Sequence, residues 1–195
     1  MIFEGAQGVL LDETWGFHPH TTWSDITAAP ALALLEPEAD REVRRLGVLR
    51  TYATRHGAGP FPTEGTLTRD EPHNSDAGPQ GRFRTGVLDL TLLRYALEIC
   101  PVDGLALTHL DRAPGEVCVG YAEAGPPALI RGGRLVPGAP EDLEHRARLG
   151  AWLRTVTPTL EAADPARWLE AHLAPVLLES RGPTAADKRW TRRQP

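Results

Sequence analysis

The sequence has few cysteines, no long hydrophobic run and no excess of basic residues. Its two cysteines, Cys100 and Cys118, lack the C-x-x-C spacing of a metal knuckle, and so few thiols argue against a disulfide framework and fit a reducing cytoplasm. The apolar runs are too short to span a bilayer, and no signal peptide is recognisable, so we expect a cytoplasmic protein without a membrane partner. A net charge of −5 gives no reason to expect a nucleic-acid partner. The locally basic tail, 188–193, is expected to be a frayed, solvated end.

The sequence also lacks a glycine-rich phosphate loop. The strings Gly57-Ala-Gly59 and Gly81-Arg-Phe-Arg84 come nearest, but neither has a Gly-Lys step into a helix. The sequence also offers no convincing set of metal ligands. His18 and His20 flank a proline and could bind a metal, but no cysteine or third histidine lies nearby to complete the set. We therefore expect neither a phosphate-cradling loop nor a metal site within the chain.

The patterns that are present predict an α/β fold. The 195 residues are enough for one domain with a sizeable core, and strand-like segments alternate with helix-like ones. Helix starts are marked by Ser24-Asp25 and by Asp164, which is followed by Pro165. The predicted strands are 46–52, 104–108 and 176–178, the predicted helices are 26–36, 88–99, 140–156 and 164–173, and a hairpin is expected to join 116–122 to 128–136.

Two segments are expected to depart from regular structure. Residues 54–86 are rich in glycine and proline and are expected to form one long loop, which in a compact domain is usually functional or mobile. We expect the mobile part to be 65–80. Residues 1–3 have the character of a buried strand end, which would leave a sheet edge in need of a partner.

The first motif is the string Glu4-Gly-Ala-Gln-Gly8. Two glycines around a glutamine suit a sharp turn that brings backbone close to a ligand, although a tight turn with no ligand fits equally well. With the apolar residues around it, this string resembles the F-E-G-A-Q-G-T-L-L-D signature of adenylosuccinate synthetases, where it lies in the wall of the nucleotide pocket. The resemblance implies that Gln7 and Gly8 contact IMP.

The next segment, 15–22, resembles the string G-T-Y-P-x-V-T of the same family. Gly16, Pro19 and Thr22 match that pattern, while His18 and His20 stand where the family commonly has aromatic residues. The resemblance implies that Thr22 hydrogen-bonds the phosphate of IMP.

A longer string, Thr51-Tyr-Ala-Thr-Arg-His-Gly-Ala-Gly-Pro-Phe-Pro-Thr-Glu64, resembles the family's Y-T-T-R-V-G-x-G-P-F-P-T-E. Arg55 is a permanent cation that can hold a carboxylate through two hydrogen bonds. The resemblance implies that this arginine helps to bind aspartate. His56 replaces the valine that is usual in the family.

The string Gly81-Arg-Phe-Arg-Thr-Gly-Val-Leu-Asp89 is similar to the family's G-R-x-R-R-x-G-W-x-D, one residue shorter. The resemblance implies that Arg82 binds IMP and aspartate and that Arg84 binds aspartate and GTP. The missing residue leaves the register of the two arginines open, and a solvated basic loop is the alternative interpretation.

The last pair of motifs concerns guanine. Leu107-Thr-His-Leu-Asp111 is similar to the [NT]-K-x-D motif of GTP-binding proteins, in which the aspartate accepts two hydrogen bonds that adenine cannot donate. His109 replaces the lysine, and a capped turn without a ligand remains the alternative. Ser180-Arg-Gly-Pro-Thr184 resembles the family's S-x-G-P. The resemblance implies a GTP site made of His109, Asp111, Ser180, Gly182 and Pro183, with Arg84.

These strings occur in family order and together resemble the C-terminal half of an adenylosuccinate synthetase. The resemblance implies an α/β fold related to P-loop GTPases, present over 1–195 as one partial domain. It also implies a ligase that uses GTP and magnesium to join aspartate to IMP: O6 of IMP is phosphorylated, and the aspartate amine then displaces the phosphate.

The family's N-terminal G-D-E-G-K-G-K loop, its aspartate base and its histidine acid have no counterpart here, so no catalytic residue or magnesium ligand is assigned. An upstream part of the same gene, an N-terminal partner chain or a homodimer is expected to complete the site. A role of His18, His20 or His56 as the acid stays open. The alternatives are a non-catalytic purine-nucleotide-binding module and a relic that only keeps the fold.

Overall fold

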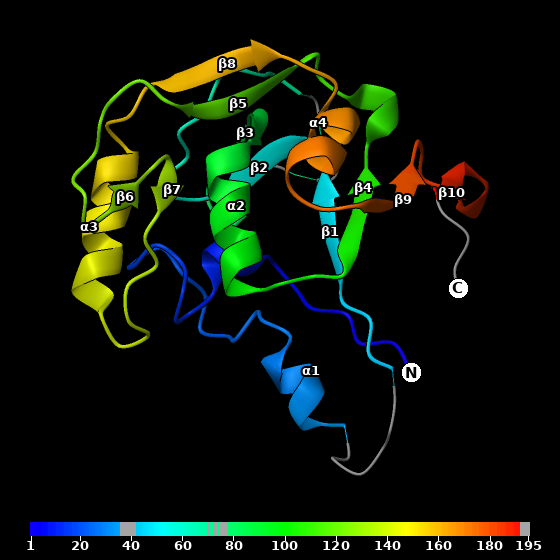
Figure 1. Ribbon diagram of the computed structural model, residues 1–195, viewed down its shortest axis with the longest axis horizontal. Coiled ribbons are helices and arrows are strands. Elements are labelled where there is room, and N and C mark those ends of the chain that lie inside the picture. Colours follow the sequence, from blue (N-terminus) through cyan, green and yellow to red (C-terminus); the bar gives the residue numbers. More distant parts are fainter. Residues whose placement is uncertain (36–41, 70, 72–73, 75–77, 192–195) are drawn as a thin grey trace.

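The computed structural model describes residues 1–35, 42–69, 71, 74 and 78–191, and these form two four-stranded sheets, a small hairpin and several helices (Figure 1). The α/β fold predicted from the sequence is confirmed. The elements are, in order, η1 (Val9–Leu11), α1 (Ala29–Ala33), β1 (Leu46–Arg50), β2 (Tyr52–His56), β3 (Phe83–Asp89), α2 (Leu90–Ile99), β4 (Gly104–Thr108), η2 (Leu110–Arg112), β5 (Glu116–Tyr121), β6 (Ile130–Arg131), β7 (Arg134–Leu135), α3 (Leu143–Leu153), β8 (Pro158–Ala162), α4 (Pro165–His172), β9 (Val176–Ser180), η3 (Ala185–Asp187) and β10 (Lys188–Trp190).

The first sheet has the strand order β1-β4-β9-β10. The first three strands run parallel, so their carboxyl ends lie at one edge, and β10 pairs antiparallel with β9. The central strand β4 is apolar and almost wholly buried, as expected for a parallel strand covered on both faces. The frayed tail expected at 188–193 is wrong for its first residues, because Lys188 and Arg189 bond to β9; residues 192–193 lie outside the described part.

The second sheet has the order β2-β3-β5-β8 and carries most of the arginine motifs. Strands β2 and β3 are antiparallel neighbours, β3 and β5 are parallel, and β5 and β8 are antiparallel. Strand β3 runs directly into α2, whose N-cap Asp89 accepts hydrogen bonds from Thr91 N and Leu92 N at 3.0 Å. The cap satisfies two of the unpaired N–H groups that begin every helix.

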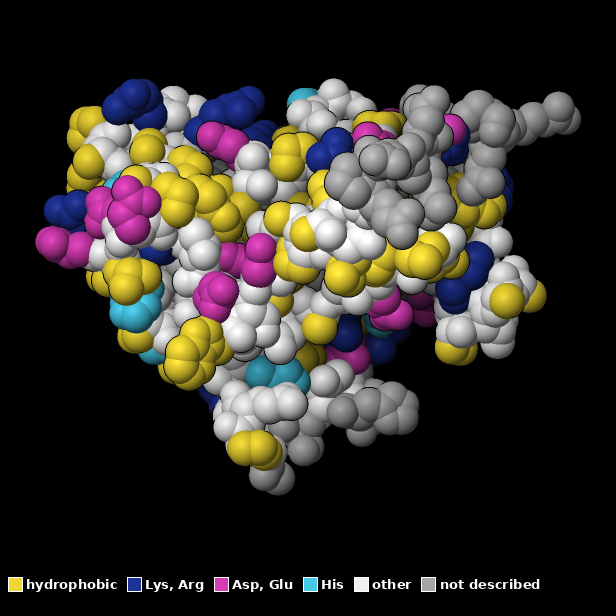
Figure 2. All heavy atoms as spheres, turned by 90° about the horizontal axis from the view of Figure 1, so that it is seen from below, with side chains coloured by type: hydrophobic (Ala, Val, Ile, Leu, Met, Phe, Trp, Pro, Cys, Tyr) yellow, Lys and Arg dark blue, Asp and Glu magenta, His cyan; other side chains and the backbone are white. Residues whose placement is uncertain are grey.

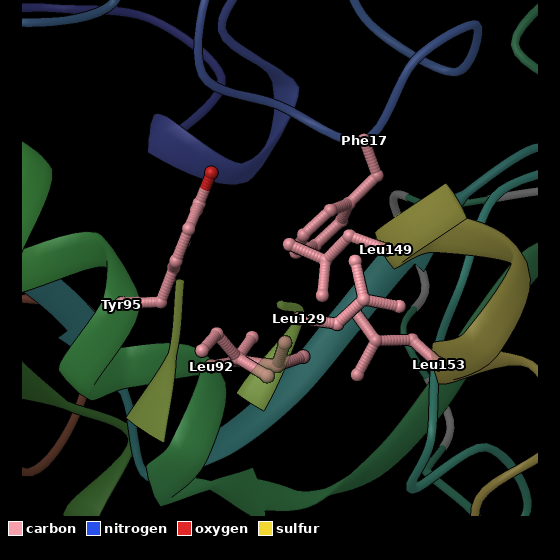
Figure 3. Packing of buried hydrophobic residues seen from close by; sticks show 7 residues of the cluster. Phe17, Leu92, Tyr95, Leu129, Leu149 and Leu153 are labelled. Atoms are coloured by element: carbon pink, nitrogen blue, oxygen red, sulfur yellow. The ribbon is translucent and has the colours of Figure 1, made fainter. Parts of the chain in front are cut away.

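Two buried apolar clusters hold the sheets and helices together. One joins the loop before α1 to α2, β7 and α3, and Figure 3 shows Phe17 pointing toward Leu149 with Tyr95 on the opposite side. The other packs α4 against β4 and β9, with Leu107 and Leu169 both fully buried. On the face seen in Figure 2, acidic, basic and hydrophobic side chains are interspersed. No described helix combines the length and hydrophobicity needed to cross a bilayer.

Several predicted strands differ in their bounds or partners. The strand expected at 46–52 is broken at Thr51, whose N and Oγ1 bond to the carbonyls of Thr108 and His109, so β1 and β2 belong to different sheets. The loop expected at 54–86 is wrong at both ends, because β2 and β3 pair there. Strand β5 pairs with β3 and β8, whereas β6 and β7 form a hairpin of their own around Gly132-Gly133.

The helix predictions fail mainly at their starts. The helix expected at 26–36 is only α1, because Asp25 bonds to Thr27 and Ile26 N donates to Asp12, which leaves the cap position to Ala28 without a side-chain bond; residue 36 lies outside the described part. Residues 88 and 89 of the helix expected at 88–99 belong to β3, and the helix expected at 140–156 is shorter, as α3. The prediction of Asp164 as a helix cap is confirmed.

Two further predictions concern segments outside the regular helices and strands. Residues 1–3 form no strand and are exposed. The expected mobile loop at 65–80 lies partly outside the described residues, and its mobility stays a prediction.

Candidate functional site

The candidate guanine site lies at the carboxyl edge of the first sheet. Strands β4 and β9 are parallel neighbours, with Leu107 opposite Glu179, so the loops that follow them emerge side by side. The segment His109–Asp111 therefore emerges beside the end of β9, and η2 contacts that strand, although about 70 residues separate the two segments in the chain. Ligands of open parallel sheets bind in the crevice outside such strand ends.

The two loops at this edge have defined conformations. Ser180 is buried and its hydroxyl donates to Gly182 O at 3.2 Å. Lys188 donates to the carbonyls of Gly182 and Thr184 at 2.6 and 2.9 Å, which holds the loop through Pro183 against β10. A side chain at Gly182 would meet the Asp187 carboxylate, which would then have to move.

His109 adopts a left-handed conformation, with φ of 61°, directly after β4. Its ring Nδ1 lies 2.8 Å from Thr108 Oγ1, and its ring packs edge-on against Tyr52 with centroids 5.5 Å apart. Burial, and then Arg50, lower the pKa of His109, so the imidazole is neutral at physiological pH. This chain thus places an uncharged ring beside the exposed Asp111 carboxylate, where the motif usually has a lysine.

A polar cluster that sequence reasoning missed covers the same edge. The Tyr52 hydroxyl donates to Glu71 Oε1, and Arg50 Nη1 lies 3.3 Å from the same oxygen. Arg112 Nη1 lies 3.9 Å away, and Arg69 donates to Arg112 O. Burial raises the pKa of Glu71, but the Tyr52 hydroxyl and the arginines outweigh it and hold the pKa below its usual value. No motif marks Glu71, so only the tertiary structure could reveal it.

The arginine motifs meet on β2 and β3. Arg55 and Arg84 are opposite each other in the antiparallel pair. Arg55 is buried and donates from Nε to Ala58 O at 3.1 Å, while Arg84 donates from Nη2 to Gly57 O at 2.6 Å and Gly59 O at 3.2 Å. Two guanidinium groups therefore hold the carbonyls of one three-residue loop.

Glu64 joins the two arginines of the third motif. Its Oε2 lies 2.7 Å from Arg84 Nη1, and its Oε1 accepts from Arg82 Nη2. The side chain of Arg84 is 11% exposed and that of Arg82 67%, so the first is fixed and the second can swing. The alternative of a wholly solvated basic loop is therefore wrong for Arg84, which lies on a strand.

The N-terminal motif forms a separate part of the site. Gln7 and Gly8 are exposed and have φ values of 70° and 127°, in the turn that enters η1. Thr22 donates from Oγ1 to Leu11 O at 2.9 Å and lines a surface cavity of about 530 Å³ with Thr21 and Arg146.

Among the described residues, no hydrogen bond joins Gln7 or Gly8 to Arg82. Thr22 is connected to the arginines by the backbone: two residues before it, the carbonyl of His20 accepts a hydrogen bond from Arg55 Nη2 at 2.9 Å.

Magnesium has no visible ligand set in the described part of the chain. No three His, Cys, Asp or Glu side chains come together there in a group that could hold a metal ion. No step is assigned to magnesium.

The fold and this polar edge define an α/β protein of the open-sheet class, in which ligands are held at the carboxyl ends of parallel strands. The family model of adenylosuccinate synthetase matches residues 1–156, so the chain belongs to the adenylosuccinate synthetase family. The loop at Ser180–Pro183 lies beyond that match.

Curated relatives support the same membership. The adenylosuccinate synthetases of Xanthomonas campestris pv. campestris (strain B100) and Stenotrophomonas maltophilia (strain R551-3) are each 39% identical over 134 residues, which are 64% of this chain and 31% of those proteins. The chain thus spans about a third of the length of the curated relatives it matches.

Two solved structures are similar in fold. A fully ligated adenylosuccinate synthetase from Plasmodium falciparum superposes with a TM-score of 0.69 at 23% identity, covering 97% of this chain and 49% of that one. The succinoaminodeoxyadenylate synthetase of cyanophage S-2L, bound to dGMP and to dATP as an energy donor, gives a TM-score of 0.55 at 21% identity, covering 97% and 46%.

Proposed function

We propose that this chain is the substrate-binding part of an adenylosuccinate synthetase-type ligase, which joins aspartate to IMP with GTP as the energy donor. The observation that carries the proposal is the meeting of His109–Asp111 and Ser180–Pro183 at one sheet edge, because the β4–β9 pairing brings together the two motifs that a guanine site needs. Membership of the family supplies the reaction class.

In this proposal Asp111 selects the base. Its exposed carboxylate accepts two hydrogen bonds from the N1–H and amino group of guanine, which adenine cannot donate. The Ser180–Pro183 loop closes over the base, and the neutral ring of His109 packs beside it in place of a lysine stem.

The arginines serve the anionic substrates. Arg82 and Arg84, with Arg55 behind them, bind the carboxylates of aspartate, and Arg82 also reaches IMP. Gln7, Gly8 and Thr22 hold IMP itself. Fixed guanidinium groups also neutralise charge on a transferring phosphoryl group, and the near-buried Arg84 is placed to contact GTP in this way.

The chemical steps need parts that these 195 residues do not contain. Phosphoryl transfer to O6 requires a loop that cradles the phosphates, a base for N1 and an acid near O6. We propose that a segment outside these residues, either an upstream part of the same gene or a partner chain, carries the family's G-D-E-G-K-G-K loop and supplies them together with the magnesium ligands. This chain then contributes binding and orientation.

Calorimetry tests the guanine site directly. We expect the chain, alone or with its partner, to bind GTP more tightly than ATP, and Asp111→Asn to abolish that preference, since each charged hydrogen bond contributes about 1.5–3 kcal/mol. Glu116→Gln, an exposed acidic residue on β5, is the control that leaves the preference unchanged. The ATP arm matters because a structural relative was solved with dATP as its energy donor. Equal affinity for GTP and ATP in the unmodified chain would refute the proposal.

A further inference from the structure

A group of basic side chains converges where the loop before α1 meets β2, β3 and the end of α3. Arg154, the C-cap of α3, donates from Nη2 to His20 Nε2. Arg55 donates to the carbonyl of the same histidine at 2.9 Å, and Arg84 lies opposite Arg55 on the neighbouring strand. Three arginines and a histidine from four segments that are distant in the sequence thus come together in one place.

This positive charge is only partly balanced. Glu64 pairs with Arg84 at 2.7 Å. Neither Arg55 nor Arg154 has a carboxylate within ion-pair distance in the part of the chain that the structure describes. Three guanidinium groups face one carboxylate, which Arg82 also shares, so at least two positive charges are left. A phosphate monoester carries about −1.5 to −2 at pH 7, so it matches that surplus better than a single carboxylate does.

The surroundings of His20 report the same imbalance. Burial lowers the pKa of His20, and Arg154, Arg55, Arg84 and His18 lower it further by repulsion. Arg55, for which burial and the repulsion of Arg84 and Arg154 act together, has its pKa lowered to about 10. Such mutual repulsion is destabilising unless an anion relieves it, and groups perturbed in this way cluster at binding sites.

The geometry also leaves donors for a ligand. Because arginine can only donate, His20 Nε2 accepts the bond from Arg154, and the proton of the neutral ring sits on Nδ1. Arg154 is exposed and keeps further N–H groups on its planar fork, whereas Arg55 is fixed behind the site by its bonds to Ala58 O and His20 O.

We propose that His20 and Arg154, backed by Arg55, form a binding site for a phosphate monoester. The site goes beyond the function proposed above, which gives no role to His20 or Arg154, and it does not depend on the guanine site. Its ligand is a phosphate group, free or as the monoester of a nucleotide.

The test uses inorganic phosphate as the probe, with AMP and succinate as separate arms. Calorimetry is expected to show phosphate binding that weakens about tenfold or more in Arg154→Ala, because a charge-assisted hydrogen bond is lost. The phosphate affinity of Arg154→Lys is expected to lie between those of the unmodified chain and Arg154→Ala, since lysine keeps the charge and loses the planar fork of donors. Arg148→Ala, on the same helix and 58% exposed, is the matched control and should leave binding unchanged.

A second measurement separates a binding role from a structural one. In NMR titrations the pKa of the His20 ring should rise when phosphate is added, because the anion offsets the repulsion of the arginines, and this rise should be absent in Arg154→Ala. Tighter binding of AMP than of phosphate would identify a nucleotide as the source of the group. The proposal is overturned if phosphate does not bind, if Arg148→Ala weakens it as much as Arg154→Ala, or if succinate binds as well as phosphate.

Discussion

Glu64 and Arg84 form an ion pair of 2.7 Å, and the other oxygen of the same Glu64 accepts from Arg82. One carboxylate of the chain itself therefore bridges the two guanidinium groups that we propose for aspartate. The pair shows that a single carboxylate can span both arginines. Of these, Arg84 is nearly buried and Arg82 is exposed.

Replacement of Arg84 by lysine should destabilise the fold. Arg84 donates to Glu64 and to the carbonyls of Gly57 and Gly59, and one ammonium group cannot reproduce that fork. We expect Arg84→Lys to lower the free energy of unfolding by about 1–3 kcal/mol, measured by urea denaturation. Arg82→Lys, at an exposed position, is the control and should change it by less than about 0.5 kcal/mol. Equal effects of the two variants would show that the Arg84 contacts are not maintained in solution.

Glu64→Gln should strengthen the binding of a dicarboxylic amino acid. The Glu64 carboxylate neutralises the charges that we propose for aspartate, so its removal leaves N–H groups of both arginines able to donate to a ligand carboxylate. Calorimetry with L-aspartate in the presence of IMP should show affinity about three- to tenfold higher. Glu98→Gln, an exposed residue of α2, is the matched control. Weaker binding in Glu64→Gln would show instead that Glu64 orients the arginines for the substrate.

Asp89 should make the fold more stable at mildly acidic pH. Burial raises the pKa of this fully buried carboxyl from 3.8 to about 6, although Leu92 N, the Tyr121 hydroxyl and Thr91 N partly oppose the rise. Between these two values the folded state binds more protons than the unfolded state, so stability falls as the pH rises from about 4 to 6. The shift corresponds to about 2–3 kcal/mol.

The measurement is urea unfolding from pH 4 to 7 for the unmodified chain and for Asp89→Asn, which still caps α2. The difference in the free energy of unfolding between the two should change with pH across that window. A constant difference for Asp89→Asn would contradict the raised pKa.

The 195-residue chain should not form adenylosuccinate by itself. It contains no phosphate-cradling loop, and general acid–base help alone contributes about a hundred- to ten-thousand-fold to such a reaction. Purified chain given IMP, aspartate, GTP and magnesium should therefore stay at background in a product assay by chromatography. Addition of a polypeptide that carries the G-D-E-G-K-G-K loop should restore turnover. Product from the chain alone would require His18, His20 or His56 to act as the acid.

The sequence determined the features that depend on neighbouring residues. Asp164 followed by Pro165 marked the start of α4, because a cap and a proline act within one turn of the chain. Short apolar runs marked β4 and the first three residues of β9, and β4 is apolar because it is buried on both faces. The motif strings predicted the family, because each string can be recognised from consecutive residues alone.

Only the tertiary structure decided which of these pieces meet. Thr51 divides one apolar run between two sheets by bonding to the carbonyls after β4, and no local pattern records that distant partner. Glu64 and Glu71 are ordinary acidic residues in the sequence, and their roles arise from arginines that other segments supply. Ion pairs and strand pairings depend on contacts across the chain, so His20 and Arg154, 134 residues apart, became neighbours only in the folded molecule.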